Sequence, residues 1–220
     1  ELSWAWRKSY ISTFLERDLP NLGISTSPQD MRRLWTMLAH YHGNIINYTE
    51  LGRSLSLSDT TIRRHIHLLE GSFMIRTLKP WFENIKKRQV KSPKVYIRDS
   101  GLFQTLLNIT EDVGLHPKVG ASWEGFALEE IIRYHEADPE DCYFWATSNQ
   151  AELDLLIVRG NKRMGFEFKY SDAPRMTQSL HSALEDLKLD KITVITPGDI
   201  DFLIHEKVRA IGLKNYVLSG

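Results

Sequence analysis

The sequence predicts an α+β protein, with a helical N-terminal part followed by an α/β C-terminal part. Three observations predict this order. Apolar residues recur at helical spacing early in the chain, as at Leu34 and Leu38. Short apolar runs typical of strands dominate after position 140. Between them, the segment 111–120 is rich in turn-forming residues and is interpreted as a linker between two domains.

The composition excludes several classes of protein. The chain has 28 Lys and Arg against 28 Asp and Glu, so any attraction to nucleic acid must come from local clusters of charge. Its single cysteine, Cys142, excludes an internal disulfide, suits a reducing cytoplasm and is predicted to be a buried thiol. No apolar run is long enough to span a bilayer and no signal peptide is visible, so we expect no membrane partner.

Residues 1–19 predict an amphipathic helix with an aromatic stripe, which Pro20 and Gly23 are expected to end. The stripe is interpreted as a packing surface. It could pack on another part of a longer protein, on the rest of this chain or on a second copy, so a homo-oligomer stays open. Residues 1–27 are assigned to this helix and its connection.

Residues 28–110 have the pattern of a winged helix-turn-helix domain. A helix begins at Pro28, a short second helix covers 47–55, and a third helix capped by Ser58 follows a tight turn. In this plan the last helix enters the major groove of DNA. The exposed residues predicted to contact nucleic acid from this helix are Thr60, Arg63, Arg64 and His67.

Strands at 73–78 and 94–97 would form the wing. The loop between them carries a cluster of cations that suits contact with phosphate, namely Lys86, Lys87, Arg88 and Lys91. DNA is the expected partner, with RNA as the alternative. The cluster could instead be a solvated run of charge, and the winged helix could dock on a protein. A short helix capped by Asp99 is expected next.

The second predicted domain covers 120–220. It begins with a helix and continues with strands, a second helix and a buried β-branched strand. The expected elements are a helix at 122–136, strands at 143–147, 152–158 and 164–170, a helix at 175–188 and strands at 192–196, 200–204 and 208–211.

Charged residues interrupt two of these strands. Asp154 lies among apolar residues, and Glu167 and Lys169 lie on one face of the next strand because residues two apart share a face. Gly160 and Asn161 predict a hairpin between the two strands, which would bring Asp154 opposite the other two. Two carboxylates and a lysine between apolar strands suit a divalent metal ion that activates water for phosphodiester cleavage.

Asp154 with the triplet Glu167-Phe168-Lys169 resembles the active-site signature of the PD-(D/E)XK restriction-endonuclease-like superfamily, and the predicted element order resembles its core. The resemblance implies that Asp154 and Glu167 bind Mg²⁺ or Mn²⁺, with the Phe168 carbonyl as a third ligand. It also implies that Lys169 orients the attacking water or stabilises developing charge on the phosphate. Glu124, on the preceding helix, would be an outer ligand or would orient one.

The segments 10–18 and 92–102 and the acid-x-lysine triplet occur in this order, and together they resemble the C-terminal half of a prokaryotic AAA-type ATPase family. In that family an N-terminal ATPase precedes a region called DUF4143, and the resemblance covers nearly the whole chain. It implies an ATPase domain as a partner. This chain has no Gly-x-x-x-x-Gly-Lys-Ser/Thr motif and begins without Met, so it is interpreted as a fragment without the ATPase.

The predicted function is therefore a DNA-binding, metal-dependent nuclease-like module that hydrolyses phosphodiester bonds. The alternative is a non-catalytic module that binds nucleic acid or a protein and regulates the ATPase. Each site residue has a plainer interpretation too. Asp154 could be a surface acid, Glu167 and Lys169 an exposed pair of charges, and Glu124 a solvated helix residue.

Overall fold

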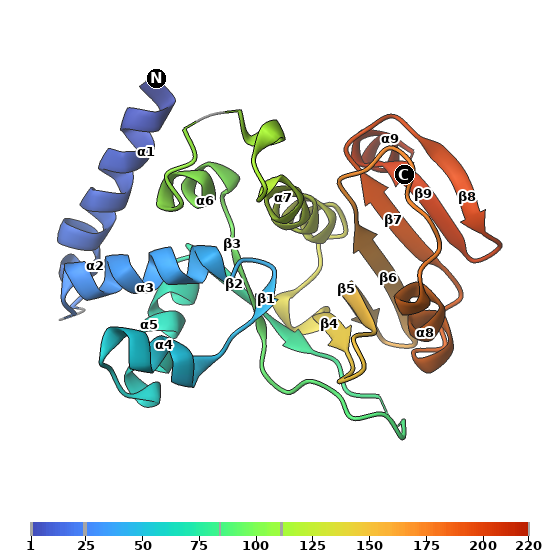
Figure 1. The fold of residues 1–220 in the computed structure, drawn as a ribbon, viewed down its shortest axis with the longest axis horizontal. Coiled ribbons are helices and arrows are strands. Elements are labelled where there is room, and N and C mark those ends of the chain that lie inside the picture. Colours follow the sequence, from blue (N-terminus) through green and yellow to red (C-terminus); the bar gives the residue numbers. More distant parts are fainter. Residues whose placement is uncertain (1, 24–25, 84, 111, 220) are drawn as a thin grey trace. The chain divides into compact units, whose positions relative to one another are not determined.

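A computed structural model describes residues 2–23, 26–83, 85–110 and 112–219, and it is α+β with a mixed sheet (Figure 1). Asn84 in the predicted wing loop and Glu111 in the predicted linker lie outside the described residues. The helices are α1 (Leu2–Thr13), a π-helical segment (Phe14–Asp18), α2 (Leu19–Asn21), α3 (Pro28–His40), α4 (Tyr48–Leu55), α5 (Asp59–Gly71), α6 (Ser100–Leu106), α7 (Val119–Tyr134), α8 (Gln178–Asp186), α9 (Leu213–Leu218) and short 3₁₀ turns at Val113–Leu115 and Pro139–Asp141.

The strands are shorter and mostly lie in the second half of the chain. They are β1 (Asn44–Ile45), β2 (Ile75–Pro80), β3 (Lys94–Ile97), β4 (Cys142–Ala146), β5 (Glu152–Arg159), β6 (Lys162–Phe168), β7 (Ile192–Thr196), β8 (Asp201–His205) and β9 (Val208–Gly212). The predicted order of elements is confirmed for both halves, and α9, the two-residue β1 and the two 3₁₀ turns had no counterpart in the prediction.

The chain forms two compact units. The first comprises 1–77 and 95–122, and the second comprises 78–94 and 123–220. The predicted N-terminal segment, 1–27, therefore groups with the helices that follow it. The stretch predicted as the wing loop groups with the second unit instead.

In the first unit the helices share one apolar core. Met31, Leu34, Trp35 and Leu38 of α3 are fully buried, and their spacing of three and four residues puts them on one helix face. Ser27 caps this helix by accepting a hydrogen bond from the Asp30 backbone N–H at 3.3 Å. The predicted start of α3 is thus confirmed.

The N-terminal helix packs into this same core through Ile11, Phe14 and Leu15. Pro20 does not end the helix as predicted, because it lies within α2. A π-helical segment precedes α2, and Pro20 lies in the first turn of α2, where a proline is tolerated. The chain leaves the helix only after Asn21, with Gly23 at a positive φ of 76°.

Helices α4 and α5 form the predicted pair with a tight turn. Asn47 caps α4, and Ser58 caps α5 by accepting from the Thr61 backbone N–H at 3.1 Å. Between the helices, Ser56 adopts a left-handed conformation. The turn folds closely over α4, because a Cβ atom at Gly52 would lie 2.7 Å from the Leu57 carbonyl oxygen.

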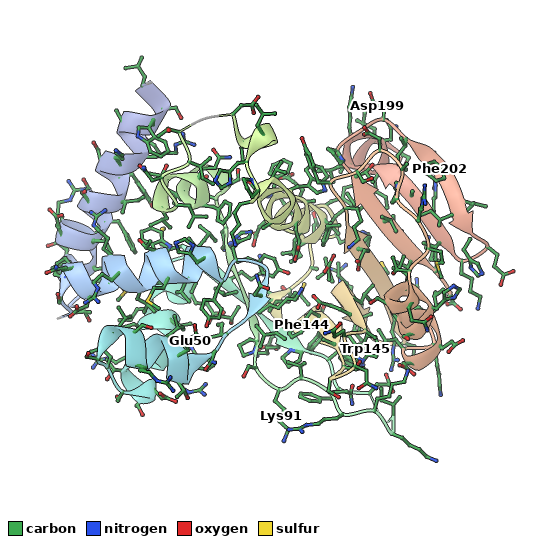
Figure 2. The ribbon with its side chains drawn as sticks, viewed as in Figure 1. Glu50, Lys91, Phe144, Trp145, Asp199 and Phe202 are labelled. Atoms are coloured by element: carbon green, nitrogen blue, oxygen red, sulfur yellow. The ribbon has the colours of Figure 1, made fainter. Side chains whose placement is uncertain are left out.

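The second unit is built on a mixed sheet. Strands β4, β5 and β6 are antiparallel neighbours, β6, β7 and β9 are parallel, and β8 closes the edge against β9 in antiparallel sense. Helix α8 lies between β6 and β7 in the chain, which confirms the predicted β-α-β connection. Phe144 and Trp145 of β4 are fully buried (Figure 2), and Cys142 is 1% exposed, so the predicted buried thiol is confirmed.

The segment 78–94 lines the β4 edge of this sheet. Lys79 and Pro80 pair in parallel with β4, and the Val90 N–H donates to the Ala146 carbonyl at 3.1 Å. The Ser148 N–H likewise donates to the Arg88 carbonyl. Backbone groups of the predicted wing loop are thus engaged by the second unit.

The predicted hairpin of β5 and β6 is confirmed, and its connection is only two residues long. Arg159 pairs with Lys162, so Gly160 and Asn161 form the loop. Gly160 has a φ of 57°, which glycine adopts without steric cost and which this type of tight hairpin turn requires. The turn fixes the register of the two strands that carry the acidic residues. Among the described residues, no helix has the length and apolar character to cross a membrane.

The close packing at Gly52 leads to a stability prediction. Gly52→Ala should lower the free energy of unfolding by about 1–3 kcal/mol, since the new methyl group has to displace the Leu57 carbonyl. Gly71→Ala is the control, because nothing lies within 4 Å of its added Cβ. We expect Gly71→Ala to leave the free energy of unfolding in urea unchanged. Equal losses of stability in the two variants would contradict the close contact at Gly52.

Candidate functional site

Asp154 and Glu167 meet on neighbouring strands of the second unit. Leu155 pairs with Phe166, and one step further along the hairpin Asp154 lies beside Glu167. Asp154 is 6% exposed and Glu167 5% exposed. Their burial contradicts the plainer interpretations of a surface acid and of an exposed charge pair.

Both carboxylate oxygens of Asp154 are engaged. Oδ2 accepts a hydrogen bond from the Phe168 backbone N–H at 3.0 Å, which ties the carboxylate to β6. Oδ1 lies 3.5 Å from the Nζ of Lys94, the first residue of β3. Asp154 is therefore held between a backbone donor on one side and a lysine on the other.

Lys169 follows the last residue of β6, and its ammonium lies 2.7 Å from Glu167 Oε1. The Lys169 side chain is 45% exposed. Burial alone would lower the pKa of Lys169, but the carboxylates of Glu167 and Asp154 outweigh it and raise the pKa. The ammonium is thus charged and within reach of solvent. Tyr170 is 49% exposed because the strand has already ended at Phe168.

Glu167 has a strongly perturbed environment. Burial first, and the charge of Asp154 second, raise the pKa of Glu167 to about 8, although the lysines oppose the shift. Its second oxygen, Oε2, is buried without a hydrogen-bond partner among the described residues. The Glu167 carboxyl is therefore short of positive charge and of hydrogen-bond donors among the described residues.

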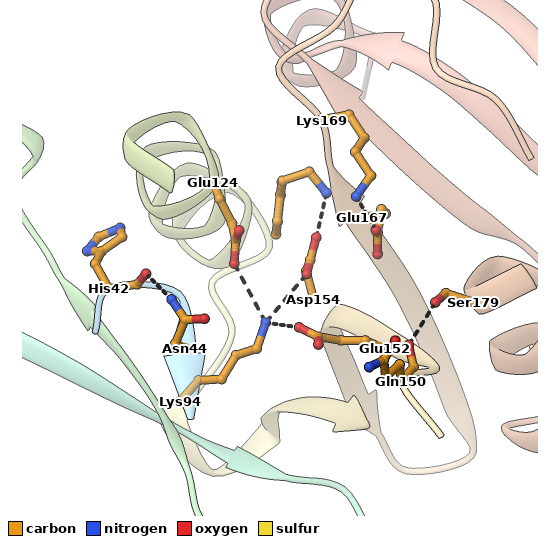
Figure 3. Close-up of polar contacts among 11 residues, drawn as sticks. His42, Asn44, Lys94, Glu124, Gln150, Glu152, Asp154, Glu167, Lys169 and Ser179 are labelled. Carbon is orange, nitrogen blue, oxygen red and sulfur yellow. Dashed lines mark hydrogen bonds and ion pairs between the residues drawn. The ribbon is translucent and has the colours of Figure 1, made fainter. Parts of the chain in front are cut away.

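A second lysine organises the acids on the other side (Figure 3). The Lys94 ammonium reaches Glu124 at 3.7 Å and Asp154 at 3.5 Å, and it forms a close ion pair with Glu152. The Lys94 side chain is 3% exposed. Its ammonium also lies 5.6 Å from the centre of the Phe144 ring. Helix α7 and strands β3 and β5 each contribute to this cluster, which we call the Lys94 cage.

Lys94 is the site residue that the sequence reasoning missed. It lies in the segment 92–102, which supported the family resemblance and the second wing strand but gave Lys94 no role of its own. The signal was a lysine that opens a run of otherwise apolar strand residues, all of which the structure buries. The structure also gives Glu124 a place in the cluster, with its side chain 20% exposed and facing Lys94. It is therefore not a freely solvated helix residue.

Among the described residues, no group of three or more His, Cys, Asp or Glu side chains is spaced to hold a metal ion. The Lys94 ammonium contacts Glu124, Glu152 and Asp154 at once and supplies a positive charge among them. The residues that could hold a hard divalent cation are the buried carboxylates Asp154 and Glu167, since carboxylate oxygens are its preferred ligands.

The residues predicted to contact nucleic acid are all exposed, in two separate places. In the first unit they lie on α5, where the Arg63 guanidinium covers the Tyr48 ring at 3.6 Å. In the second unit they lie on the loop before β3 (Figure 2 labels Lys91), where Lys87 pairs with Asp186 at 2.6 Å. The eight residues are Thr60, Arg63, Arg64, His67, Lys86, Lys87, Arg88 and Lys91.

A polar cavity of about 420 Å³ lies between the turn that precedes β5 and helix α8. The Ser179 hydroxyl donates to the Gln150 carbonyl across it at 3.3 Å (Figure 3). Amide and hydroxyl side chains dominate its lining, which includes Lys87, Asn149, Gln150, Gln178, Ser179 and Ser182. Such a lining suits a polar ligand with several hydrogen-bonding groups.

Two families match the chain. Residues 1–113 match the family described as domain of unknown function DUF8612, and because this is more than half of the chain, the chain belongs to that family. Residues 119–216 match the domain of unknown function DUF4143. The predicted DUF4143 region is thus confirmed for the C-terminal part, whereas the N-terminal part matches a different family.

Two mycobacterial proteins are similar over the whole chain. They are "Uncharacterized protein Mb2031c" of Mycobacterium bovis and "Uncharacterized protein Rv2008c" of Mycobacterium tuberculosis, each 45% identical over 222 residues. These matches cover 100% of this chain and 50% of each relative, so the chain spans about half the length of the curated relatives it matches. No solved structure matches the chain.

The perturbed Glu167 predicts a pH dependence of stability. Its pKa in the folded state, about 8, lies above the usual value of 4.5, so the folded protein holds this proton more tightly. The contribution to stability is full below pH 4.5 and is lost as the pH rises to about 8. Glu167→Gln should remove this loss, and urea unfolding at pH 5 and pH 8 measures it. Glu140→Gln, at an exposed position, is the control. An unchanged pH profile in Glu167→Gln would contradict the assignment.

Proposed function

We propose that the second unit is a metal-dependent, nuclease-like module that hydrolyses phosphodiester bonds. The observation that carries this proposal is the buried Asp154–Glu167 pair with the Lys169 ammonium 2.7 Å from Glu167. A buried pair of carboxylates is costly unless a cation or a proton neutralises it. A half-exposed lysine at its edge is suited to meet an anionic substrate.

The donor set fits Mg²⁺ or Mn²⁺. Asp154 and Glu167 would hold the ion, since Mg²⁺ is usually bound by one or two carboxylates together with water. The orphaned Oε2 of Glu167 and the raised pKa of this residue both indicate a missing positive charge. When bound, such an ion supplies an activated water molecule for attack on phosphorus.

The protein's own residues would divide the remaining work. Lys169 would bind a non-bridging phosphate oxygen and stabilise the charge that develops there. The Phe168 N–H holds Asp154 in orientation through its hydrogen bond to Oδ2. Glu124 would act indirectly, because it faces Lys94 at 3.7 Å, and Lys94 in turn contacts Asp154.

DNA is the substrate we favour, with RNA as the alternative. The exposed cations of α5 and of the loop before β3 offer phosphate contacts, and α5 follows α4 through a tight turn as in helix-turn-helix proteins. The relatives are about twice as long as this chain, which leaves room for the proposed N-terminal ATPase partner. A cytoplasmic location and self-association belong to the same proposal.

A non-catalytic module that binds nucleic acid or protein is the second candidate. The observation that favours it is the Lys94 cage, because Lys94 already offsets the charge of three carboxylates, Glu124, Glu152 and Asp154. In this alternative the acids and lysines hold the fold together. The same surfaces would bind DNA without cleaving it.

Cleavage of supercoiled DNA in Mg²⁺ or Mn²⁺ tests the proposal. Asp154→Asn and Lys169→Met should each reduce cleavage by at least a hundredfold, because one removes a metal ligand and the other a phosphate contact. Lys162→Met, at an exposed position on β6, is the control and should keep full activity. A folded wild-type protein without cleavage, or equal cleavage by all variants, would favour the non-catalytic module.

DNA binding is tested separately from cleavage. Replacing Arg63 and Arg64 with Gln should weaken DNA binding and flatten its dependence on salt. With fewer phosphate contacts, binding releases fewer counterions from the DNA. The same double change at Lys188 and Lys191 is the control for total charge. Binding is measured by fluorescence anisotropy between 50 and 200 mM salt, roughly the range over which phosphate contacts dominate. Equal affinity in both pairs of variants would remove α5 from the proposed interface.

A further inference from the structure

We propose that Lys94 is a tethered cation that competes with a divalent metal ion for Asp154 and its neighbouring carboxylates. The inference rests on the proposed metal-dependent function and deepens it. It assigns to Lys94 a positioning role in the site, in which the lysine sets the affinity for the metal ion. Binding of the ion would require the ammonium to move away from Asp154.

The position of the Lys94 ammonium among carboxylates is the first reason. Its three carboxylate partners come from α7 and β5, at 3.7 Å for Glu124, 3.5 Å for Asp154 and in a close contact for Glu152 (Figure 3). The Lys94 ammonium is nearly fully buried and surrounded by carboxylate oxygens. Carboxylate oxygens are also the ligands that a hard divalent cation prefers. The protein supplies the positive charge from its own chain.

The oxygens of Asp154 are the second reason. Oδ2 is committed to the Phe168 N–H at 3.0 Å, so Oδ1 is the oxygen that can turn to a cation. Lys94 already occupies the surroundings of Oδ1 at 3.5 Å. A metal ion bound through Oδ1 therefore has to share this oxygen with the ammonium or replace it.

The balance of charge is the third reason. The ion pairs at the cluster set four acidic side chains, those of Glu124, Glu152, Asp154 and Glu167, against the two ammonium groups of Lys94 and Lys169. The buried Glu167 Oε2 has no hydrogen-bond partner in the part of the chain that the structure describes. The cluster could thus bind further positive charge, but the Lys94 ammonium occupies the position with the most carboxylate neighbours.

The two lysines differ in a way that assigns them different roles. The side chain of Lys169 is 45% exposed and can turn to a substrate phosphate. The side chain of Lys94 is 3% exposed and starts from a strand whose other residues are all buried. Lys94 is therefore directed at the carboxylates and away from substrate. Its removal should change how the acids bind cations.

The experiment measures Mn²⁺ binding by isothermal titration calorimetry and the melting temperature with and without Mg²⁺ or Mn²⁺. Lys94→Met keeps most of the length of the side chain and removes its charge. We expect Lys94→Met to melt lower than wild type without metal, to bind Mn²⁺ at least tenfold more tightly, and to regain stability when the ion is added. The wild-type melting temperature should respond much less.

Two variants control the result. Lys162→Met removes an exposed lysine of β6 and should leave Mn²⁺ binding unchanged. Lys94→Met combined with Asp154→Asn should lose the gain, because the carboxylate for which the two cations compete is gone. A gain that persists in this double variant, or an affinity in Lys94→Met no higher than in wild type, overturns the proposal.

A variant that fails to fold is informative too. If Lys94→Met is unfolded without metal, millimolar Mn²⁺ should restore its far-ultraviolet circular dichroism, since the ion replaces the ammonium. Lys94→Met with Glu152→Gln carries one carboxylate fewer and should fold more readily while keeping the gain in affinity. Failure of both variants to fold at any Mn²⁺ concentration would show that the ammonium is irreplaceable and would overturn the proposal.

The outcomes separate this proposal from the proposed function. Tight Mn²⁺ binding by Lys94→Met without DNA cleavage by any variant supports the tethered cation and refutes the nuclease. Cleavage by wild type, with unchanged Mn²⁺ affinity in Lys94→Met, supports the nuclease and refutes the tethered cation.

Discussion

The contact between the Lys94 ammonium and the carboxylates of Glu124, Glu152 and Asp154 is the interaction on which the candidate site depends. Acidic side chains repel one another when they are drawn together in a poorly solvated place, and a buried lysine alone is equally unfavourable. The lysine offsets the repulsion between the carboxylates, and the carboxylates offset the cost of burying the lysine. Because the partners come from β3, β5 and α7, the interaction also ties residues of three elements together.

The remaining geometry follows from the hairpin of β5 and β6. Its two-residue turn fixes the register, the register brings Asp154 beside Glu167, and apolar neighbours such as Leu155 and Phe166 bury the pair. The strand ends at Phe168, so Lys169 leaves the sheet and reaches solvent. The result is a site with a buried acidic interior and one cation at its mouth, which suits an anionic substrate better than a neutral one.

Much of this could be predicted from the sequence, because it depends on local patterns. The alternation around Asp154 and Glu167, the Gly160 turn and the cap at Ser58 all act over a few residues. Lys94 could not be assigned in the same way, since it lies about 60 residues before Asp154 in the sequence and its burial depends on distant partners. The backbone contacts of the wing loop could not be assigned from the sequence for a similar reason, because their partner is the backbone of β4.

A double-mutant cycle on Lys94 and Asp154 tests the central claim most directly. The free energy of unfolding is measured in urea for wild type, Lys94→Met, Asp154→Asn and the double variant, without metal ions. If the two charges depend on each other, the double variant is less destabilised than the sum of the single ones, by about 0.5–3 kcal/mol. Additive losses, within about 0.5 kcal/mol, would contradict the account, because Lys94 and Asp154 would then contribute independently.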